Sequence, residues 1–174
     1  SEIVLYDVAS GEPTNTLSGH TGIISRIDFA EEQPWLVSGG LDKQLILWDV
    51  STGEILQQFA DHTGVIIDVT ISDDGTLVAS STGDDTTEDT GNDLADRIVR
   101  LFDAQTGELI RTFNPESGYV RAVDISPDNR LLLSASWGAD TRGIIDVWDI
   151  STGEQARRLF GHINFVTDAL FSPD

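Results

Sequence analysis

Residues 47–54 read LWDVSTGE, an apolar stretch that ends in an aromatic residue, an aspartate and a glycine-containing turn. Near copies occur elsewhere in the 174-residue chain: LYDVASGE at 5–12, LFDAQTGE at 101–108 and VWDISTGE at 147–154. Glycine readily adopts the positive φ of tight turns, so Thr52-Gly53 is predicted to turn one strand into the next. The octet therefore predicts repeated architecture rather than repeated chemistry.

The repeat has a regular spacing that three separate markers share. The aromatic-aspartate pairs lie 42, 54 and 46 residues apart, beginning at Tyr6, Trp48, Phe102 and Trp148. A second marker, clearest as Gly-His at 19–20 and 161–162, keeps the same steps through 61–62 and 115–116. A third stays in phase as ISDDG at 71–75, ISPDN at 125–129 and FSPD at 171–174. Three markers in phase indicate an internal repeat.

Within one period the pattern is typical of β-strands. In IISRIDF (23–29) apolar and polar residues alternate, which places them on opposite faces of a strand. TLVASS (76–81) and LLLSAS (131–136) are apolar runs of strand length, and EILQQFA (54–60) predicts a weaker fourth strand. No stretch supports a helix of three turns.

A period near 42 residues, with four strands, Gly-His at the start and Trp-Asp on the third strand, resembles the WD-repeat β-propeller family over essentially the whole chain. The resemblance implies an all-β β-propeller of WD-repeat type with an incomplete ring, three full blades and partial blades at both ends. The expected units are the last two strands of a preceding blade (1–17), blades at 18–60, 61–114 and 115–160, and the first strand of a truncated blade (161–174). A longer propeller, or another copy of the chain, would complete the ring.

In that family a His, a Ser or Thr, an Asp and the Trp hydrogen-bond across each blade. The resemblance transfers this network to His20, Ser38, Asp42 and Trp48 in the first full blade, to His62, Ser80 and Asp96 in the second, and to Ser134 and Trp148 in the third. Phe102 replaces the second Trp and has no N–H donor. Glu116 takes the third His position, and the third Asp is displaced, with Asp140 as the candidate.

Composition excludes several classes of function. Thirty Asp and Glu residues stand against ten Lys and Arg, for a net charge of −20, which disfavours nucleic acid and anionic membranes as partners. No apolar run approaches a membrane span, and the absence of cysteine excludes disulfides and thiolate chemistry. The cytoplasm is the expected compartment. The chain starts at Ser1 without Met, so no targeting signal can be read.

The sequence gives no support for catalysis, a metal or a cofactor. The three histidines fall in equivalent positions of different blades, where they are predicted to be structural. The acidic insertion TGDDTTEDTGND (82–93) has enough carboxylates to suggest calcium, but its spacing does not match a calcium loop. A solvated acidic loop is the preferred interpretation.

Five residues are candidates for partner binding. A shorter insertion at 137–143 contains Trp137 and Arg142, a combination typical of binding hot spots, although Trp137 could equally pack on a neighbouring blade. Three residues past the His position stand Tyr119 and Phe165, and five past it stands Arg121. These positions differ from blade to blade, which is also what drift at unconstrained surface sites would produce.

Two functions follow as hypotheses, one of binding and one of chemistry. The first is a non-catalytic propeller segment, a protein-interaction scaffold or sensor portion of a larger protein, which binds a protein or peptide on the rim that carries the Gly-His turns and inserted loops. The alternative is a small-ligand or metal-binding propeller, enzymatic in some form, that uses the central channel. There Asp68 and Asp168 occupy equivalent inward positions, with Arg26 and Ala122 in the other two. A blade array that mediates self-association is a third possibility.

Overall fold

The computed structural model describes residues 1–60, 62–83, 98–115, 119–137 and 142–173. The regular structure of these residues consists of β-strands. The described residues include no helix that is long and apolar enough to cross a membrane. The strands are β1 (Glu2–Tyr6), β2 (Pro13–Ser18), β3 (Ile24–Phe29), β4 (Trp35–Gly40), β5 (Leu45–Asp49), β6 (Ile55–Phe59), β7 (Val65–Ile71), β8 (Leu77–Gly83), β9 (Val99–Asp103), β10 (Leu109–Phe113), β11 (Tyr119–Ile125), β12 (Leu131–Trp137), β13 (Gly143–Asp149) and β14 (Gln155–His162).

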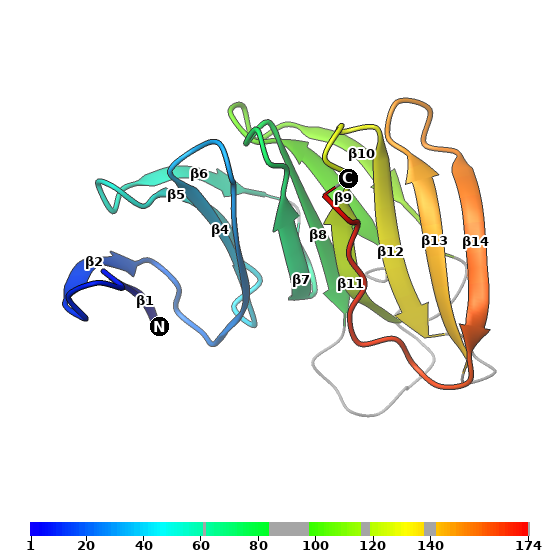
Figure 1. Cartoon of the computed structure of the whole chain (residues 1–174), viewed down its shortest axis with the longest axis horizontal. Helices are drawn as coiled ribbons and strands as arrows, with labels where there is room; N and C mark the ends of the chain where they lie inside the picture. Colours follow the sequence, from blue (N-terminus) through cyan, green and yellow to red (C-terminus); the bar gives the residue numbers. More distant parts are fainter. Residues whose placement is uncertain (61, 84–97, 116–118, 138–141, 174) are drawn as a thin grey trace.

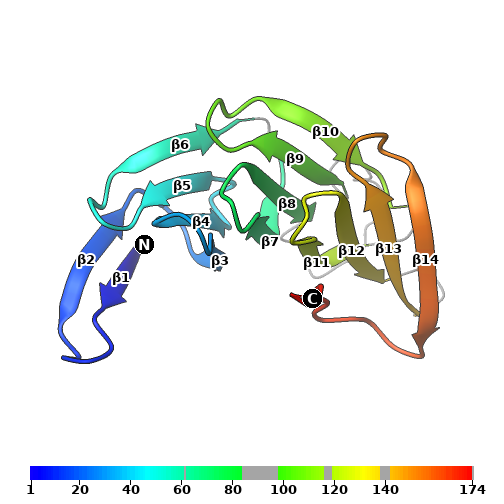
Figure 2. The ribbon, with the colours of Figure 1, turned by 45° about the horizontal axis from the view of Figure 1, so that its top comes forward.

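The strands form four separate antiparallel sheets in chain order. β1 and β2 make a two-stranded sheet, and β3–β6, β7–β10 and β11–β14 each make a four-stranded one. The sheets stand side by side along an arc (Figures 1 and 2), with β3, β7 and β11 on its inner side and β6, β10 and β14 on its outer side. The arc does not close. The predicted all-β, incomplete WD-type propeller is confirmed.

The repeated octet forms the hairpin between the third and fourth strands of each blade. The Asp49 carboxylate accepts the backbone N–H groups of Ser51 and Thr52 at 2.8 and 3.1 Å, which fixes the turn. Gly53 then adopts a φ of 79° and donates its N–H to the Asp49 carbonyl at 2.8 Å. Glycines at the same place in the other three octets also have positive φ: Gly11, Gly107 and Gly153.

The core lies between neighbouring sheets, where a large side chain of each outer strand packs on the aromatic residue of the next octet. The pairs are Leu17 with Trp48, Phe59 with Phe102 (ring centroids 5.2 Å apart) and Phe113 with Trp148 (5.7 Å). All six side chains are buried. Burying one such side chain stabilises the fold by about 1.5–3 kcal/mol, so these contacts hold the sheets together.

The segment after β14 differs from the strand expected at 161–174. β14 continues to His162, and residues 163–173 have no strand pairing. They turn back to the inner side of the arc (Figure 2), where the Phe171 N–H donates to the Asp124 carboxylate at 2.6 Å and Val166 is buried against Ala122 and Ala135. A strand needs a hydrogen-bonded ladder, and no part of the described chain offers this segment one.

Candidate functional site

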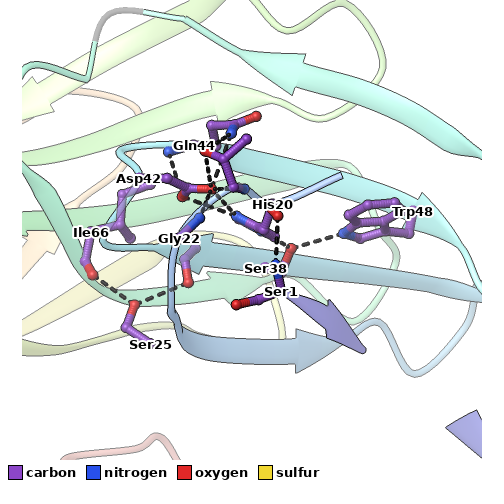
Figure 3. Close-up of polar contacts among 11 residues, drawn as sticks. Ser1, His20, Gly22, Ser25, Ser38, Asp42, Gln44, Trp48 and Ile66 are labelled. Carbon is purple, nitrogen blue, oxygen red and sulfur yellow. Dashed lines mark hydrogen bonds and ion pairs between the residues drawn. The ribbon is translucent and has the colours of Figure 1, made fainter. Parts of the chain in front are cut away.

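The polar network of the first full blade is complete. The Ser38 hydroxyl lies 2.8 Å from His20 Nε2 and accepts the indole N–H of Trp48 at 2.8 Å (Figure 3). His20 Nδ1 lies 3.0 Å from the Asp42 carboxylate. One assignment satisfies every group: Nδ1–H donates to the carboxylate, and the Ser38 hydroxyl donates to Nε2. These side chains are therefore engaged in joining the strands of one blade.

Asp42 anchors the start of the blade as well as the histidine. Its carboxylate accepts the backbone N–H groups of Thr21 and Gly22 at 2.7 and 3.1 Å. Burial favours the neutral form of Asp42, but the hydrogen bonds from His20 and these two N–H groups outweigh it and lower its pKa to about 2. The ionised carboxylate thus holds the Gly-His turn against the turn between β4 and β5.

Only part of the expected network of each of the next two blades lies within the described residues. In the second, His62 Nε2 lies 2.9 Å from the Ser80 hydroxyl, and Phe102 contacts the imidazole ring without a hydrogen bond. In the third, Trp148 donates its indole N–H to Ser134 at 2.9 Å. Three further positions of the expected networks lie outside the described residues: Asp96, Glu116 and Asp140. Among the residues that the structure describes, no group of three His, Asp or Glu could hold a metal ion.

The structure brings four of the five candidate binding residues together on the third blade. The Trp137 and Phe165 rings lie 5.9 Å apart, and the Arg121 guanidinium lies 5.6 Å above the Phe165 ring. Tyr119, the first residue of β11, pairs with Trp137, the last residue of β12. Arg142 stands at the margin, one residue before Gly143, which pairs with Trp137 across β12 and β13. We call Tyr119, Arg121, Trp137 and Phe165 the rim cluster.

The rim cluster is open to solvent yet held in place. Phe165 is 45% exposed and Arg121 is exposed, while Tyr119 and Trp137 are half-buried. Phe165 is positioned by its neighbour Val166, which is 6% exposed and packs against Ala122 and Ala135. A cation above an aromatic ring and a second ring at its side restrict each other's rotamers. The cluster therefore presents a preformed apolar surface with a cation on top.

A cleft of about 200 Å³ lies on the inner side of the arc and tests the channel hypothesis. Asp68 and Asp168 both line it, as does Arg26, whereas Ala122 is buried in the core. Burial raises the pKa of Asp68 to about 6, and the nearby Asp168 carboxylate adds to this. The N–H of Val123 and the Arg26 guanidinium, 3.3 Å away, oppose it only in part.

The carboxylates of this cleft bridge neighbouring elements. Asp28 on β3 accepts the Ile71 N–H of β7 at 2.9 Å, and Asp68 on β7 accepts the Val123 N–H of β11 at 2.9 Å. Burial is the main cause of a raised pKa at Asp28 and at Asp124 also. Each of these carboxylates accepts a backbone N–H from the next element. They therefore have a structural role that requires no ligand.

One buried ion pair was not anticipated from the sequence. Asp146 on β13 is fully buried, and Arg158 on β14 donates to it from Nε at 2.7 Å and from a terminal nitrogen at 3.2 Å. Gln155 makes a further short hydrogen bond to the same carboxylate. The first blade has Ile46 and Gln58 at these two positions, and the second has Arg100 and Thr112, so the signal is a carboxylate where the first blade has an apolar residue.

Comparison with known proteins agrees with this architecture. A family model described as WD40, "WD domain, G-beta repeat", matches residues 11–49, 53–87 and 107–149. The chain is similar to the nuclear distribution protein PAC1 of Arthroderma benhamiae, with 29% identity over 94% of this chain and 35% of that protein. It is also similar to the guanine nucleotide-binding protein subunit beta-5b of Danio rerio, with 38% identity over 98% of this chain and 40% of that protein. The chain thus spans about two fifths or less of these relatives.

Proposed function

Because the chain belongs to the WD40 repeat family, we propose that it is a non-catalytic portion of a protein-interaction scaffold that binds a protein or peptide through the rim cluster. The observation that supports the proposal most directly is the contact of the Phe165 ring with the Arg121 guanidinium and with the tilted Trp137 ring. None of these three side chains belongs to the His-Ser-Trp networks that hold the blades together. These three side chains can therefore contact a partner without breaking those networks.

The composition of the rim cluster suits an interface anchor. Binding hot spots are enriched in Trp, Tyr and Arg, and gain most from side chains that are rigid before the partner arrives. The cluster combines three aromatic rings with one guanidinium, supported from below by the buried Val166. One relative is named as a subunit, and a subunit assembles with other protein chains. This supports a protein as the partner.

The proposal includes a role for the acidic insertion 82–93, which would select partners by their charge. It connects β8 with β9 in the same repeat position in which 137–143 connects β12 with β13. Only its first two residues, Thr82 and Gly83, fall within the described part of the chain. Five carboxylates in twelve residues would repel acidic partners and attract basic ones near the rim.

Panning of a phage-displayed peptide library on the immobilised chain tests the proposal directly. Selected peptides should lose binding at least tenfold to the variants Phe165→Ala and Trp137→Ala. Phe29→Ala is the matched control, because Phe29 is a similarly exposed aromatic residue (50%) at the far end of an inner strand. Melting temperatures should change little in all three. Selected peptides that bind Phe165→Ala and Trp137→Ala as tightly as the unsubstituted chain would overturn the assignment.

A further inference from the structure

Each sheet of the arc ends on its outer side in a strand with a hydrogen-bonded neighbour on one side only. These outer strands are β2, β6, β10 and β14 (Figure 2). Within the described part of the chain, none of them pairs with another strand along its outer edge. An edge of this kind presents backbone N–H and C=O groups to which a further extended chain can add.

Three of the four outer strands contain a residue type that discourages the addition of another strand. Proteins protect sheet edges with proline or with charged side chains in the edge strand. β2 begins with Pro13, whereas β10 has Arg111 and β14 has Arg157 at the same repeat position. β6 has Gln57 at that position, and its sequence ILQQF contains neither proline nor a charge. The outer edge of β6, called the β6 edge below, is therefore the unprotected one of the four.

The β6 edge is apolar and exposed, yet firmly held by the sheet behind it. Ile55 and Leu56 are 41% and 42% exposed, and Gln58 is exposed. On its other side β6 pairs with β5, and the Phe59 ring is buried against Phe102. Because the free groups of such an edge are satisfied by another strand, the edge fits an extended segment of a partner.

The charges around the β6 edge favour a basic partner. Glu54 directly precedes β6, and Glu108 belongs to the next octet, against whose hairpin glycine Gln57 packs; both glutamates are exposed. Two nearby cations are engaged elsewhere: Arg111 donates to carbonyls of the third blade's octet, and Lys43 donates to a carbonyl in the segment before β7. The whole chain has a net charge of −20. A segment rich in lysine or arginine is therefore attracted to this edge.

We propose that the β6 edge binds an extended, basic segment of a protein partner, which adds to the β3–β6 sheet as a further strand. The partner's backbone pairs with β6, its apolar side chains cover Ile55 and Leu56, and its basic side chains face Glu54 and Glu108. This goes beyond binding at the rim cluster, which belongs to β11, β12 and residues 163–173. A second copy of the chain fits less well, because two chains of charge −20 repel each other.

Isothermal titration calorimetry with a synthetic peptide of alternating lysine and valine, about eight residues long, tests the proposal. The peptide should bind with a dissociation constant below about 1 mM. The same peptide with a methyl group on every backbone nitrogen keeps its side chains and charge but cannot donate backbone hydrogen bonds. It should bind at least tenfold more weakly. This comparison separates strand addition from attraction by charge alone.

Substitutions on two outer strands locate the binding edge. Gln58→Lys places a charge on the β6 edge and should weaken binding of the peptide at least tenfold. Thr112→Lys is the matched control, because Thr112 is exposed at the same repeat position of β10 and the change in net charge is the same. Phe165→Ala, in the rim cluster, should also bind the peptide like the unsubstituted chain, so the two proposals can fail independently. Bound peptide should slow amide hydrogen exchange in β6.

Several results would overturn the proposal. They are no measurable binding of the peptide, equally tight binding of its methylated form, an equal loss of affinity in Gln58→Lys and Thr112→Lys, and slowed exchange in another outer strand instead of β6. Sedimentation velocity of the chain without peptide adds a further outcome. Self-association that Gln58→Lys abolishes would assign the β6 edge to a second copy of the chain and would overturn the proposal as well.

Discussion

Replacing Ser38 by alanine removes the one oxygen atom that joins His20 and Trp48 in the first full blade. Both partners are buried, with exposed fractions of 5% for His20 and 1% for Trp48, so neither can turn to water instead. A buried polar group that loses its hydrogen bond costs about 1–3 kcal/mol. Two such groups predict a loss of about 2–6 kcal/mol in the free energy of unfolding, by adding that range for each.

The third blade provides the comparison that makes this prediction specific. Among the described residues Ser134 bonds Trp148 and no histidine, so Ser134→Ala leaves one buried group without its hydrogen bond and should cost about 1–3 kcal/mol. Ser18→Ala is the control: the Ser18 hydroxyl is exposed, bonds Glu2 at 3.0 Å, and should change stability by less than about 0.5 kcal/mol.

Urea unfolding followed by tryptophan fluorescence and circular dichroism measures these differences. The comparison is valid where both probes coincide and the m-value stays constant among the variants. The expected order of stability loss is Ser38→Ala, then Ser134→Ala, then Ser18→Ala. An equal or larger loss for Ser134→Ala would show that the His20 bond adds nothing, and the reasoning about the complete network would be wrong.

Three further predictions concern buried charges. Asp68 has a pKa of about 6 when folded against an ordinary 3.8, so the folded chain binds more protons between these values. Its stability should therefore fall as pH rises from about 4 to about 6, and Asp68→Asn should flatten that decline in pH-dependent urea unfolding. Arg158→Met leaves the Asp146 carboxylate buried without its partner and should cost about 3–5 kcal/mol, whereas Asp146→Ile with Arg158→Gln, the pair found in the first blade, should recover much of that loss. Calcium titration followed by thermal shift should leave the melting temperature unchanged, because three of the cleft carboxylates, Asp28, Asp68 and Asp124, already accept backbone N–H groups; strong stabilisation at micromolar calcium would favour the channel hypothesis instead.

The fold could be predicted from the sequence because each copy of the repeat supports the interpretation of the others. A strand pattern in one segment is ambiguous, but the Asp-x-x-x-Gly hairpin recurs in phase with the Gly-His turn, and a radial array of equivalent sheets accounts for both. The contact between the rings of Phe165 and Trp137 could not be foreseen in the same way. It depends on how residues 163–173 return to β11, and these residues have no strand ladder to fix their register.

The buried pair Asp146–Arg158 shows a different limit of sequence reasoning. Two charged residues twelve positions apart carry no local signal in the sequence. Asp146 takes the position that Ile46 has in the first blade, and its burial depends on the preceding blade, which covers that face of the sheet. Charged residues are seldom buried without a partner, so neither residue, taken alone, predicts a buried position. Only the register between β13 and β14, which places Asp146 directly opposite Arg158, brings them together.

The ion pair lies between β13 and β14, away from the β11 and β12 residues of the rim cluster. In the first blade the polar network ties the Gly-His turn to the second and third strands through His20 and Asp42. In the third blade Asp146 lies opposite Ser134 and binds Arg158, which adds a polar contact between the third and fourth strands to the Ser134–Trp148 hydrogen bond. The packing beneath the rim cluster is instead apolar, through Val166 and Ala135. The outer strands can therefore be weakened by changing Arg158 while Tyr119 and Trp137, on β11 and β12, keep their pairing. Hydrogen exchange should accordingly separate the two regions, with faster exchange in β14 of an Arg158 variant and unchanged protection in β11 and β12.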